Sequence, residues 1–589
     1  MLLCWLQLSS CLVLLWLCSP SNALCPSICT CKVTEKGRRK VLCNRGGMVD
    51  PIPTSELDPG TEILEISAPP SDHNSLTIGP IFQHLKKLEE LHIRRSSVHQ
   101  IGMHPFWGVP SLKVVDLASN SIGTVLDHNF RGLVNLVELN LDDNRIRTLQ
   151  TGVFKHLTEL RILTLQRNLL DELVPRLFLK LGKLHVLKLS GNKFEELDPE
   201  VFKDVPELRV LECRGCGLRR INTQTYHLLP YLAHLDLGNN QMQFIASDEF
   251  RDLKRLHTLK LDGNQLPVVL EKTFVRQQEL KYLCLARNRL AKITNTAFLN
   301  LSSLVDLDIG YNKLDRIEMV ALQHVADTLQ RLVISGNAFT SSVIKNILTT
   351  AYNVRDLGIA HMNLRQLPRG FVPDRVRKLN VSSNNLTELG VAALPRQLTE
   401  LDASNNKLTG LEEALVFRVE DLRRAILGAN PWQCSACRMG AAVLRANRTD
   451  SLKNLTCASP RKLRGRSLST LRSEELTACK NSGDEDAASS LSDNKVSLAV
   501  GITSLLAFLI VCIIFVVCSC MRRRARNSVR EQKRIAEMQE NSLDHPIAIF
   551  AKGEISFKFP LDLTERKVSV STIDEIKKDT QTLPNGTGI

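Results

Sequence analysis

Catalytic motifs are missing from this sequence of 589 residues. The 14 histidines are scattered, and the chain has no H-E-x-x-H, no G-x-S-x-G and no phosphate-binding P-loop sequence. No nucleophile, base and orienting group can be proposed together, so we expect neither an enzyme nor a cofactor. A recognised nucleic-acid module is also missing, so the net charge of +14 does not indicate a nucleic-acid partner.

Two stretches lack charged residues altogether. Residues 1–23 begin with an apolar run and end in Ser21-Asn22-Ala23, small residues that suit cleavage of a signal peptide after Ala23. Residues 496–520 are long enough to cross a bilayer whose hydrocarbon core is roughly 30 Å thick. An arginine-rich segment follows from Arg522, which predicts a cytoplasmic C-terminus. We therefore expect a single-pass type I protein of the plasma membrane with an extracellular N-terminus.

One pattern dominates the middle of the chain. Between Leu88 and Leu304 the sequence apolar-x-x-apolar-x-apolar-x-x-Asn restarts every 24 residues. Self-similarity at this period predicts a leucine-rich-repeat solenoid, in which each unit supplies one short strand and contacts mainly its neighbours. Less regular units extend the array on both sides, so we expect about 15 repeats over residues 61–428. The expected fold is an α/β solenoid, a horseshoe with a parallel sheet inside and a cap at each end.

The residues that recur in every unit have structural roles. In Leu139-Asn140-Leu141-Asp142 the side chains alternate, so the leucines point inward and the polar residues outward. A later position predicts a continuous aromatic spine, formed by Phe106, Phe130, Phe154, Phe178, Phe202, Tyr226, Phe250, Phe274 and Phe298. The asparagine that ends the pattern, such as Asn144, is expected to satisfy backbone groups where the chain leaves the strand. These asparagines are therefore not candidate binding sites.

Two cysteine clusters flank the repeats. Their members are Cys25, Cys29, Cys31 and Cys43 before the repeats and Cys434, Cys437, Cys457 and Cys479 after them. Disulfides persist in secreted proteins and a solenoid needs closed ends, so we predict disulfide-stapled caps at residues 24–60 and 429–479. Zinc is the alternative for the first cluster, and a redox-active C-x-x-C is the alternative for the second. The sequence alone leaves three connectivities open for the first cluster.

Both caps resemble those of extracellular leucine-rich-repeat proteins. The first cluster has the C-P-x-x-C-x-C spacing of that family, and the second is entered through Asn430-Pro431-Trp432. This chain has C-x-x-C in the second cap where the family usually has C-x-C. The pairs that the resemblance implies are Cys25–Cys31, Cys29–Cys43, Cys434–Cys457 and Cys437–Cys479.

Three further cysteines lie within the repeats. Cys213 occupies an inward leucine position and Cys216 the asparagine position. We expect both to be buried thiols, with a local disulfide as the main alternative. Cys284 falls at an outward strand position, where we expect a free and accessible thiol.

Candidate modification and adaptor sites lie on the two expected sides of the membrane. Five asparagines head Asn-x-Ser/Thr triplets on the extracellular side, namely Asn300, Asn380, Asn385, Asn447 and Asn454. Residues 480–495 are expected to form a short stalk, and residues 521–589 a short, disordered cytoplasmic tail. The final residues Thr587 and Ile589 fit the Ser/Thr-x-apolar form that PDZ domains bind, which suggests a PDZ-domain adaptor as a partner.

The outward strand positions predict a ligand-binding surface. They form columns on the concave face, with about 5 Å between neighbouring strands. The candidate ligand-binding residues are Glu138, Asp142, Asp143, Gln166, Arg167, Lys188, Arg214, His234, Asp236, Lys260, Asp262, Tyr282, Asp308 and Tyr311. Exposed tyrosines and arginines among polar neighbours favour a protein partner. The plainer alternative for Lys188 beside Glu212, and for Asp236 beside Lys260, is mutual neutralisation across strands.

From residue 25 to 520 the architecture resembles single-pass leucine-rich-repeat adhesion and recognition receptors, such as the tartan and capricious proteins of flies and the neuronal leucine-rich-repeat transmembrane proteins. The resemblance implies a cell-surface receptor or adhesion molecule that binds an extracellular protein and recruits adaptors through its tail. The alternative is a membrane-tethered accessory subunit that modulates a channel or another receptor. Presentation of a sequestered growth factor is a third option, and a second copy of the chain is a further candidate partner.

Overall fold

The computed structural model describes residues 25–478, 548–551, 554–557 and 566–568. The chain divides into two compact units, Met1–Cys479 and Lys480–Ile589. The predicted signal peptide, stalk, membrane span and C-terminal PDZ motif lie outside the described residues. Within the described ranges, no helix combines the length and the apolar character that crossing a membrane requires.

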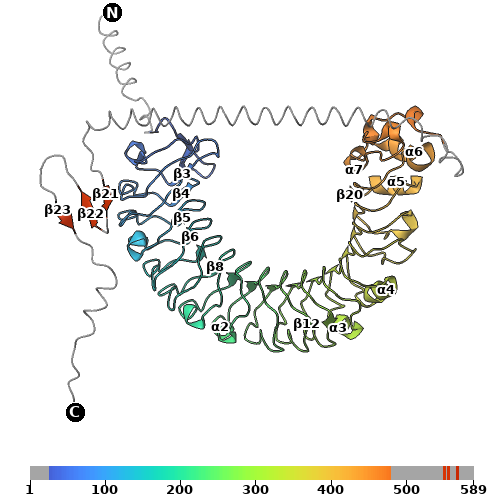
Figure 1. Cartoon of the computed structure of the whole chain (residues 1–589), viewed down its shortest axis with the longest axis horizontal. Helices are drawn as coiled ribbons and strands as arrows, with labels where there is room; N and C mark the ends of the chain where they lie inside the picture. Colours follow the sequence, from blue (N-terminus) through green and yellow to red (C-terminus); the bar gives the residue numbers. More distant parts are fainter. Residues whose placement is uncertain (1–24, 479–547, 552–553, 558–565, 569–589) are drawn as a thin grey trace, which may run out of the picture. The chain divides into compact units, whose positions relative to one another are not determined.

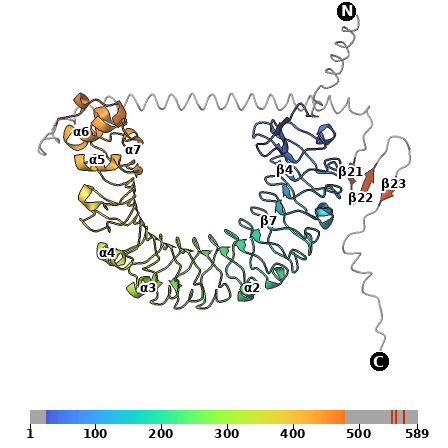
Figure 2. The same ribbon diagram turned by 180° about the vertical axis from the view of Figure 1, so that it is seen from behind.

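The first unit is built on one long sheet of 18 strands. It begins with an antiparallel hairpin of β1 (Thr30–Val33) and β2 (Arg39–Cys43). The parallel strands that follow are β3 (Ile63–Ser67), β4 (Glu90–Arg94), β5 (Val114–Asp116), β6 (Glu138–Asn140), β7 (Ile162–Thr164), β8 (Val186–Lys188), β9 (Val210–Glu212), β10 (His234–Asp236), β11 (Thr258–Lys260), β13 (Tyr282–Cys284), β15 (Asp306–Asp308), β16 (Arg331–Val333), β17 (Asp356–Gly358), β18 (Lys378–Asn380), β19 (Glu400–Asp402) and β20 (Arg424–Ile426). These strands line the inner side of a horseshoe, as Figures 1 and 2 show from opposite sides. The predicted solenoid is confirmed.

The core follows from the register of the sheet. Leu139 pairs with Leu163, which pairs with Leu187, so equivalent leucines from successive coils stack in one row. These leucines are fully buried, and each buried leucine side chain contributes roughly 1.5 to 3 kcal/mol. The predicted aromatic spine is also present, with the rings of Phe130 and Phe154 5.7 Å apart. The repeating pattern therefore encodes a single continuous core.

The asparagines at the ends of the strands form the predicted ladder. Asn144 Nδ2 donates to the carbonyls of Leu117 at 3.0 Å and Leu141 at 3.1 Å. Its Oδ1 accepts from the backbone N–H of Ile122 at 3.0 Å. One buried carboxamide thus ties two adjacent coils together where the chain turns off the strand. The structural role expected for these asparagines is confirmed.

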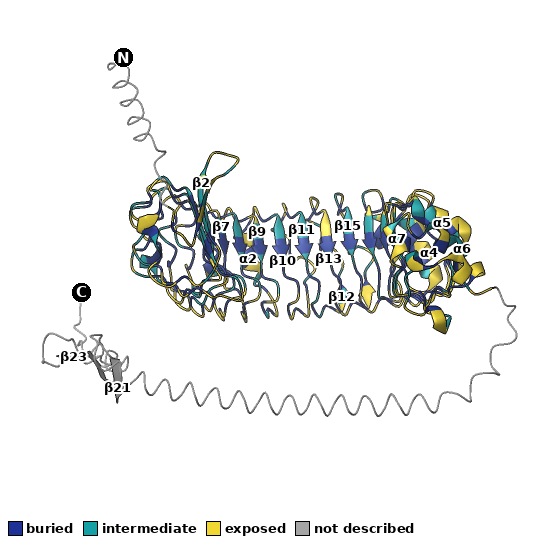
Figure 3. Cartoon of the chain, turned by 90° about the horizontal axis from the view of Figure 1, so that it is seen from above, coloured by how far each residue is buried: buried dark blue, intermediate teal, exposed yellow. Residues whose placement is uncertain are grey.

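Short helices and turns cover the outer side of the repeats. The α-helices of the first unit are α2 (Thr223–His227), α3 (Met319–Gln323), α4 (Ser341–Thr350), α5 (Glu413–Glu420), α6 (Ala436–Arg445) and α7 (Asp450–Lys453). The 3₁₀ helices are η1 (Thr54–Glu56), η2 (Asp127–Phe130), η3 (Pro199–Val201), η4 (Val391–Ala393), η5 (Arg461–Leu463), η6 (Leu468–Thr470) and η7 (Ser473–Glu475). A small second sheet pairs β12 (Val268–Val269) with β14 (Lys292–Ile293), on one edge of the solenoid in Figure 3.

Disulfides close both caps. The structure joins Cys25 to Cys31, Cys29 to Cys43 and Cys434 to Cys457, the pairs that the resemblance implies. Cys437 is disulfide-bonded as well, and its implied partner Cys479 lies outside the described residues. The described residues contain no cluster of side chains that could hold a metal ion.

The expectation of two buried thiols at Cys213 and Cys216 is wrong, because the structure joins these residues by a disulfide. Both cysteines are fully buried. Gly215, between them, has a φ of +64°, a conformation that glycine adopts without steric cost. It turns the chain sharply enough to bring the two sulfurs together.

The second unit contains three strands where we expected a disordered tail. Strand β21 (Ala548–Ala551) pairs antiparallel with β22 (Glu554–Phe557), which pairs antiparallel with β23 (Arg566–Val568). The expectation of disorder is therefore wrong for these residues. Isoleucine, phenylalanine and valine are frequent in the three segments, and such residues favour strands.

Candidate functional site

The concave face carries a groove of about 640 Å³ between β6 and β10. Its lining residues are Glu138, Asn140, Asp142, Ile162, Thr164, Gln166, Val186, Lys188, Val210, Glu212 and His234, which we call the concave groove. Figure 3 looks onto these strands, where half-buried and buried residues alternate. The groove brings together five of the predicted ligand-binding residues, Glu138, Asp142, Gln166, Lys188 and His234.

Three aliphatic side chains form the floor of the concave groove. Ile162 pairs with Val186, and Val186 pairs with Val210, so the three lie in one row across adjacent strands. All three are half-buried, although their row belongs to the solvent side of the sheet. Sequence reasoning missed them because it considered only polar outward residues. The available signal was a β-branched residue directly before the inward leucine in three consecutive repeats.

Charges around the floor are partly neutralised. Lys188 Nζ lies 3.3 Å from Glu212 Oε1. The two side chains therefore neutralise each other's charge across neighbouring strands, which was the alternative to ligand binding for this pair. Burial lowers the pKa of His234, and the nearby Lys260 lowers it further. The imidazole is therefore neutral at pH 7 and can donate or accept a hydrogen bond. The rim of the groove is polar and its centre is apolar.

Three of the predicted ligand-binding acids are largely buried, so they offer little surface to a ligand. Asp142, Asp236 and Asp262 are 7%, 5% and 9% exposed. Asp142 Oδ1 accepts from the backbone N–H of Gln166 at 2.7 Å, which ties one coil to the next. Burial raises the pKa of Asp142. The Asp142 carboxylate therefore has a structural role, because it joins two successive coils.

Arg214 holds the other two buried acids. Its guanidinium donates to Asp236 at 3.3 Å and pairs with both carboxylate oxygens of Asp262 on the following coil. Hydrogen bonding to Asp262 raises the pKa of Arg214. Lys260 Nζ lies 3.2 Å from Asp236. These two side chains also neutralise each other's charge across neighbouring strands, as the alternative for this pair stated. This cluster has few free hydrogen-bonding groups left for a ligand.

The remaining predicted residues lie away from the groove. Arg167 forms a two-pronged pair with Asp143 at 2.5 and 2.7 Å on the exposed edge. Tyr282 is 49% exposed on the concave face. Tyr311 lies beyond the end of its strand, where the Arg287 guanidinium stacks 5.1 Å from its ring centre. Asp308 is half-buried, and burial raises its pKa.

Cys284 is free, but it is not the accessible thiol that we expected. Its side chain is half-buried between neighbouring strands. Burial raises the pKa of its thiol to about 12, so the reactive thiolate is scarce at neutral pH.

The candidate glycosylation sites are distributed over the repeats and the second cap. Asn300, Asn380, Asn447 and Asn454 are exposed, and Asn385 is half-buried. Asn380 lies in β18 on the concave face, far along the sheet from the groove between β6 and β10. Its Oδ1 accepts from the hydroxyl of Ser382, the third residue of the same triplet, at 2.7 Å.

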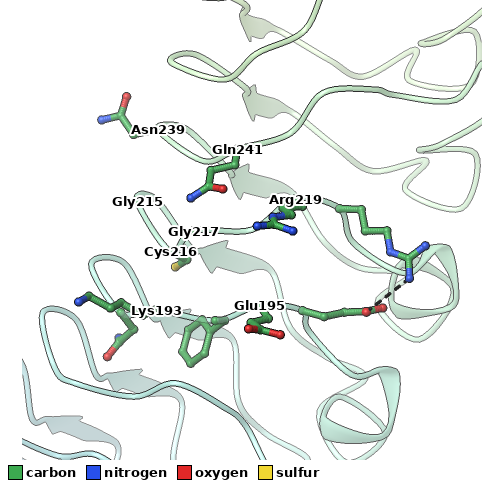
Figure 4. Close-up of a pocket in the computed structure, with 12 residues that line it drawn as sticks. Lys193, Glu195, Gly215, Cys216, Gly217, Arg219, Asn239 and Gln241 are labelled. Atoms are coloured by element: carbon green, nitrogen blue, oxygen red, sulfur yellow. Dashed lines mark ion pairs between the residues drawn. The ribbon is translucent and has the colours of Figure 1, made fainter.

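A second hollow, of about 820 Å³, lies beyond the strand ends near Cys216. Figure 4 shows Lys193, Glu195, Arg219, Asn239 and Gln241 around it. Cys216 replaces the ladder asparagine here, so no asparagine Oδ1 is present to accept the N–H of Phe194. This N–H donates instead to the Cys216 carbonyl at 2.8 Å. An ion pair of 3.7 Å between Arg220 and Glu196 closes one side. The hollow was not predicted from the sequence.

Comparison with known families decides the class of the chain. Residues 86–146, 110–170, 134–194, 158–218, 206–266 and 278–339 match the family model described as leucine rich repeat. This part of the chain is built of leucine-rich repeats. Proteins of this class are in general binding proteins and receptors without catalytic activity, and this leucine-rich-repeat protein is not an enzyme.

Individual relatives cover parts of this leucine-rich-repeat protein. It is 33% identical over 114 residues to leucine-rich repeat-containing protein 3B of Danio rerio, a match that covers 19% of this chain and 42% of that protein. A chain of the Drosophila Toll–Spatzle complex is 22% identical, with a TM-score of 0.49 and coverage of 72% of this chain and 59% of that one. A leucine-rich-repeat protein of Leptospira interrogans is 25% identical, with a TM-score of 0.48 and coverage of 66% and 88%. Both scores are modest, and we draw nothing about function from them.

Proposed function

We propose that this leucine-rich-repeat protein is a single-pass cell-surface receptor or adhesion molecule, and that its concave groove binds an extracellular protein. The observation that carries the proposal is the row of Ile162, Val186 and Val210, three aliphatic side chains open to solvent on a concave, polar-rimmed surface. Protein interfaces have this anatomy, an apolar centre that excludes water and a hydrogen-bonding rim.

The placement of the polar groups supports a protein partner over a small molecule. Glu138 from β6 and His234 from β10 lie at opposite ends of the groove, four strand steps apart. With about 4.8 Å for each strand step, they are separated by roughly 19 Å. A surface of this length suits a protein loop or strand, which can contact the apolar floor and both ends together.

The binding test begins with capture and ends with matched variants. Full-length chain displayed on cells is screened against a library of cell-surface and secreted proteins. Val186→Glu with Val210→Glu should weaken binding of a captured protein at least about 100-fold, since central interface residues contribute about 2 kcal/mol or more each. Val134→Glu with Val320→Glu is the matched control, because these valines are 51% and 45% exposed elsewhere. Equal binding by both double variants contradicts the proposal.

The proposed topology has its own test. Surface expression and glycosidase digestion should show glycans on the extracellular triplets, such as those at Asn300 and Asn447. Substituting Asn585, which heads a triplet in the proposed cytoplasmic tail, should leave the digestion pattern unchanged. A shift that disappears when only Asn585 is substituted contradicts the type I orientation.

A further inference from the structure

Five cations gather on the edge of the solenoid beyond the ends of β13 and β15. Arg287, Arg289, Lys292, Lys313 and Arg316, which we call the basic patch, are all exposed. Arg289 and Lys313 occupy equivalent positions in successive repeats, and so do Lys292 and Arg316. The patch is therefore a two-by-two array of positive charges, with Arg287 beside it, at the spacing of adjacent coils, about 5 Å.

Backbone pairing makes this array rigid. The N–H of Arg289 donates to the Leu266 carbonyl at 3.0 Å, and the N–H of Lys313 donates to the Leu290 carbonyl at 2.8 Å. Lys292 belongs to β14, which pairs with β12 in the small edge sheet visible in Figure 3. A ligand that binds the basic patch therefore has little backbone to order.

The cations of the basic patch lack acidic partners. In other coils some exposed lysines are paired, for example Lys155 with Asp127 at 3.0 Å and Lys183 with Glu159 at 2.6 Å. Among the described residues, no carboxylate lies within 4.0 Å of a basic-patch cation, and the nearest acids in sequence are Asp315 and Glu318. The patch is therefore a net positive surface whose charges are available to an external anion.

Neutral residues bound the basic patch on both sides. At the position of Arg289, the two preceding coils carry Gln241 and Gln265, and the following coil carries Ala338. Because the adjacent coils are neutral at this position, the two-by-two array is set apart from its immediate neighbours along the edge. A random scatter of solvated lysines has no such boundary.

We propose that the basic patch binds a linear sulfated polysaccharide. A chain of this kind carries closely spaced sulfates, which match cations repeated from coil to coil along the solenoid. Single-stranded nucleic acid fits less well, since its bases stack on open aromatic faces. Here the Arg287 guanidinium covers the Tyr311 ring, and the His361 ring lies 5.5 Å from it. The proposal extends beyond the protein-binding groove and uses only the extracellular placement of the proposed function.

The test measures binding of purified full-length chain to immobilised heparin in detergent. The patch variant carries Arg289→Gln, Lys292→Gln, Lys313→Gln and Arg316→Gln. The control variant carries Lys87→Gln, Arg145→Gln, Lys254→Gln and Lys345→Gln, exposed cations on other coils that also lack ion pairs with described carboxylates. Both variants lose the same charge, so net charge cannot separate them. Neither set touches the concave groove.

The patch variant should bind heparin several hundredfold more weakly at physiological salt, since each cation near a polyanionic surface contributes roughly a factor of five. The slope of log affinity against log salt should fall by about 3, while the control variant stays close to the original chain. Equal losses in both variants overturn the proposal, as does unchanged binding of the patch variant. Binding of desulfated heparin or single-stranded RNA with the same affinity and the same dependence on the patch also overturns it.

Discussion

The asparagine ladder makes a quantitative prediction for Asn168. Its Nδ2 donates to the carbonyls of Leu141 at 2.9 Å and Leu165 at 3.1 Å, and its Oδ1 accepts from the N–H of Ile146 at 3.1 Å. Asn168→Ala removes these three bonds and a longer one of 3.3 Å to the Gln166 carbonyl, which keeps the Asp143 N–H as a partner. The carbonyls of Leu141 and Leu165 also each keep a partner, because Leu141 accepts from Asn144 and Leu165 accepts from Asn192. The N–H of Ile146 alone is left buried and unpaired.

The expected loss follows from this count. A buried, unpaired N–H costs roughly 1 to 3 kcal/mol, and each lost bond to a carbonyl that keeps another partner costs roughly 0.5 to 1 kcal/mol. Asn168→Ala should therefore destabilise its coil by roughly 2 to 5 kcal/mol. Asn135→Ala is the control, since Asn135 is exposed and donates a single bond of 3.0 Å to the Pro110 carbonyl.

Hydrogen exchange of the full-length chain is the suitable assay, because a solenoid can open locally without unfolding as a whole. Peptides that cover residues 141–170 should lose at least about 30-fold in protection in Asn168→Ala, the equivalent of 2 kcal/mol. Peptides in the second cap should keep theirs. Protection in Asn168→Ala that matches protection in Asn135→Ala would refute the reasoning.

Three further predictions concern single side chains. Cys284 should react with a maleimide at pH 7.5 at least about 100-fold more slowly in the folded chain than in urea, since burial raises its pKa to about 12; comparable rates would contradict this. Asp308→Asn should stabilise the chain at neutral pH, because burial raises the Asp308 pKa and an asparagine Oδ1 keeps the 2.9 Å bond from the Gly310 N–H. By linkage, the gain in the free energy of unfolding from Asp308→Asn should be absent below about pH 3.9, where Asp308 is protonated in both the folded and the unfolded chain. The gain should grow as the pH rises toward the raised pKa of Asp308 in the folded chain, and denaturation at several pH values measures it. Arg214→Ala should cost roughly 1 to 3 kcal/mol in thermal unfolding, because it leaves Asp262 buried without a cation while Asp236 keeps only Lys260. Arg167→Ala, which exposes Asp143, should cost below about 1 kcal/mol.

Sequence periodicity was sufficient to predict the scaffold. An apolar residue repeated at one interval can be buried only if successive coils stack, so the rows of Leu139, Leu163 and Leu187 follow directly from the pattern. The ladder was predictable for the same reason, because a polar residue that interrupts an apolar pattern in every coil must have its hydrogen bonds satisfied.

The details of the site were less accessible to sequence reasoning. Outward position alone does not distinguish a free carboxylate from one that a neighbouring coil covers, and Asp142, Asp236 and Asp262 are covered. Whether Asp142 is free depends on the residue 24 positions later, here Gln166, whose backbone and side chain both donate to it. The aliphatic floor was missed because Ile162, Val186 and Val210 resemble core residues in a sequence rich in such residues.

The bond between Cys213 and Cys216 could have been favoured from the sequence. A glycine between two cysteines at this spacing allows the positive φ that the turn requires, and Gly215 has it. The described strands of the tail could also have been favoured, since only two residues separate β21 from β22 and both strands contain β-branched and aromatic residues.

Hydrogen exchange of the full-length chain with and without a captured protein tests the central claim most directly. If the concave groove is the binding surface, the bound protein should protect peptides that contain β7, β8 and β9, and leave the outer helices α3 and α4 unchanged. Protection confined to the outer side, or to the coils after β15, with none between β6 and β10, would contradict the account.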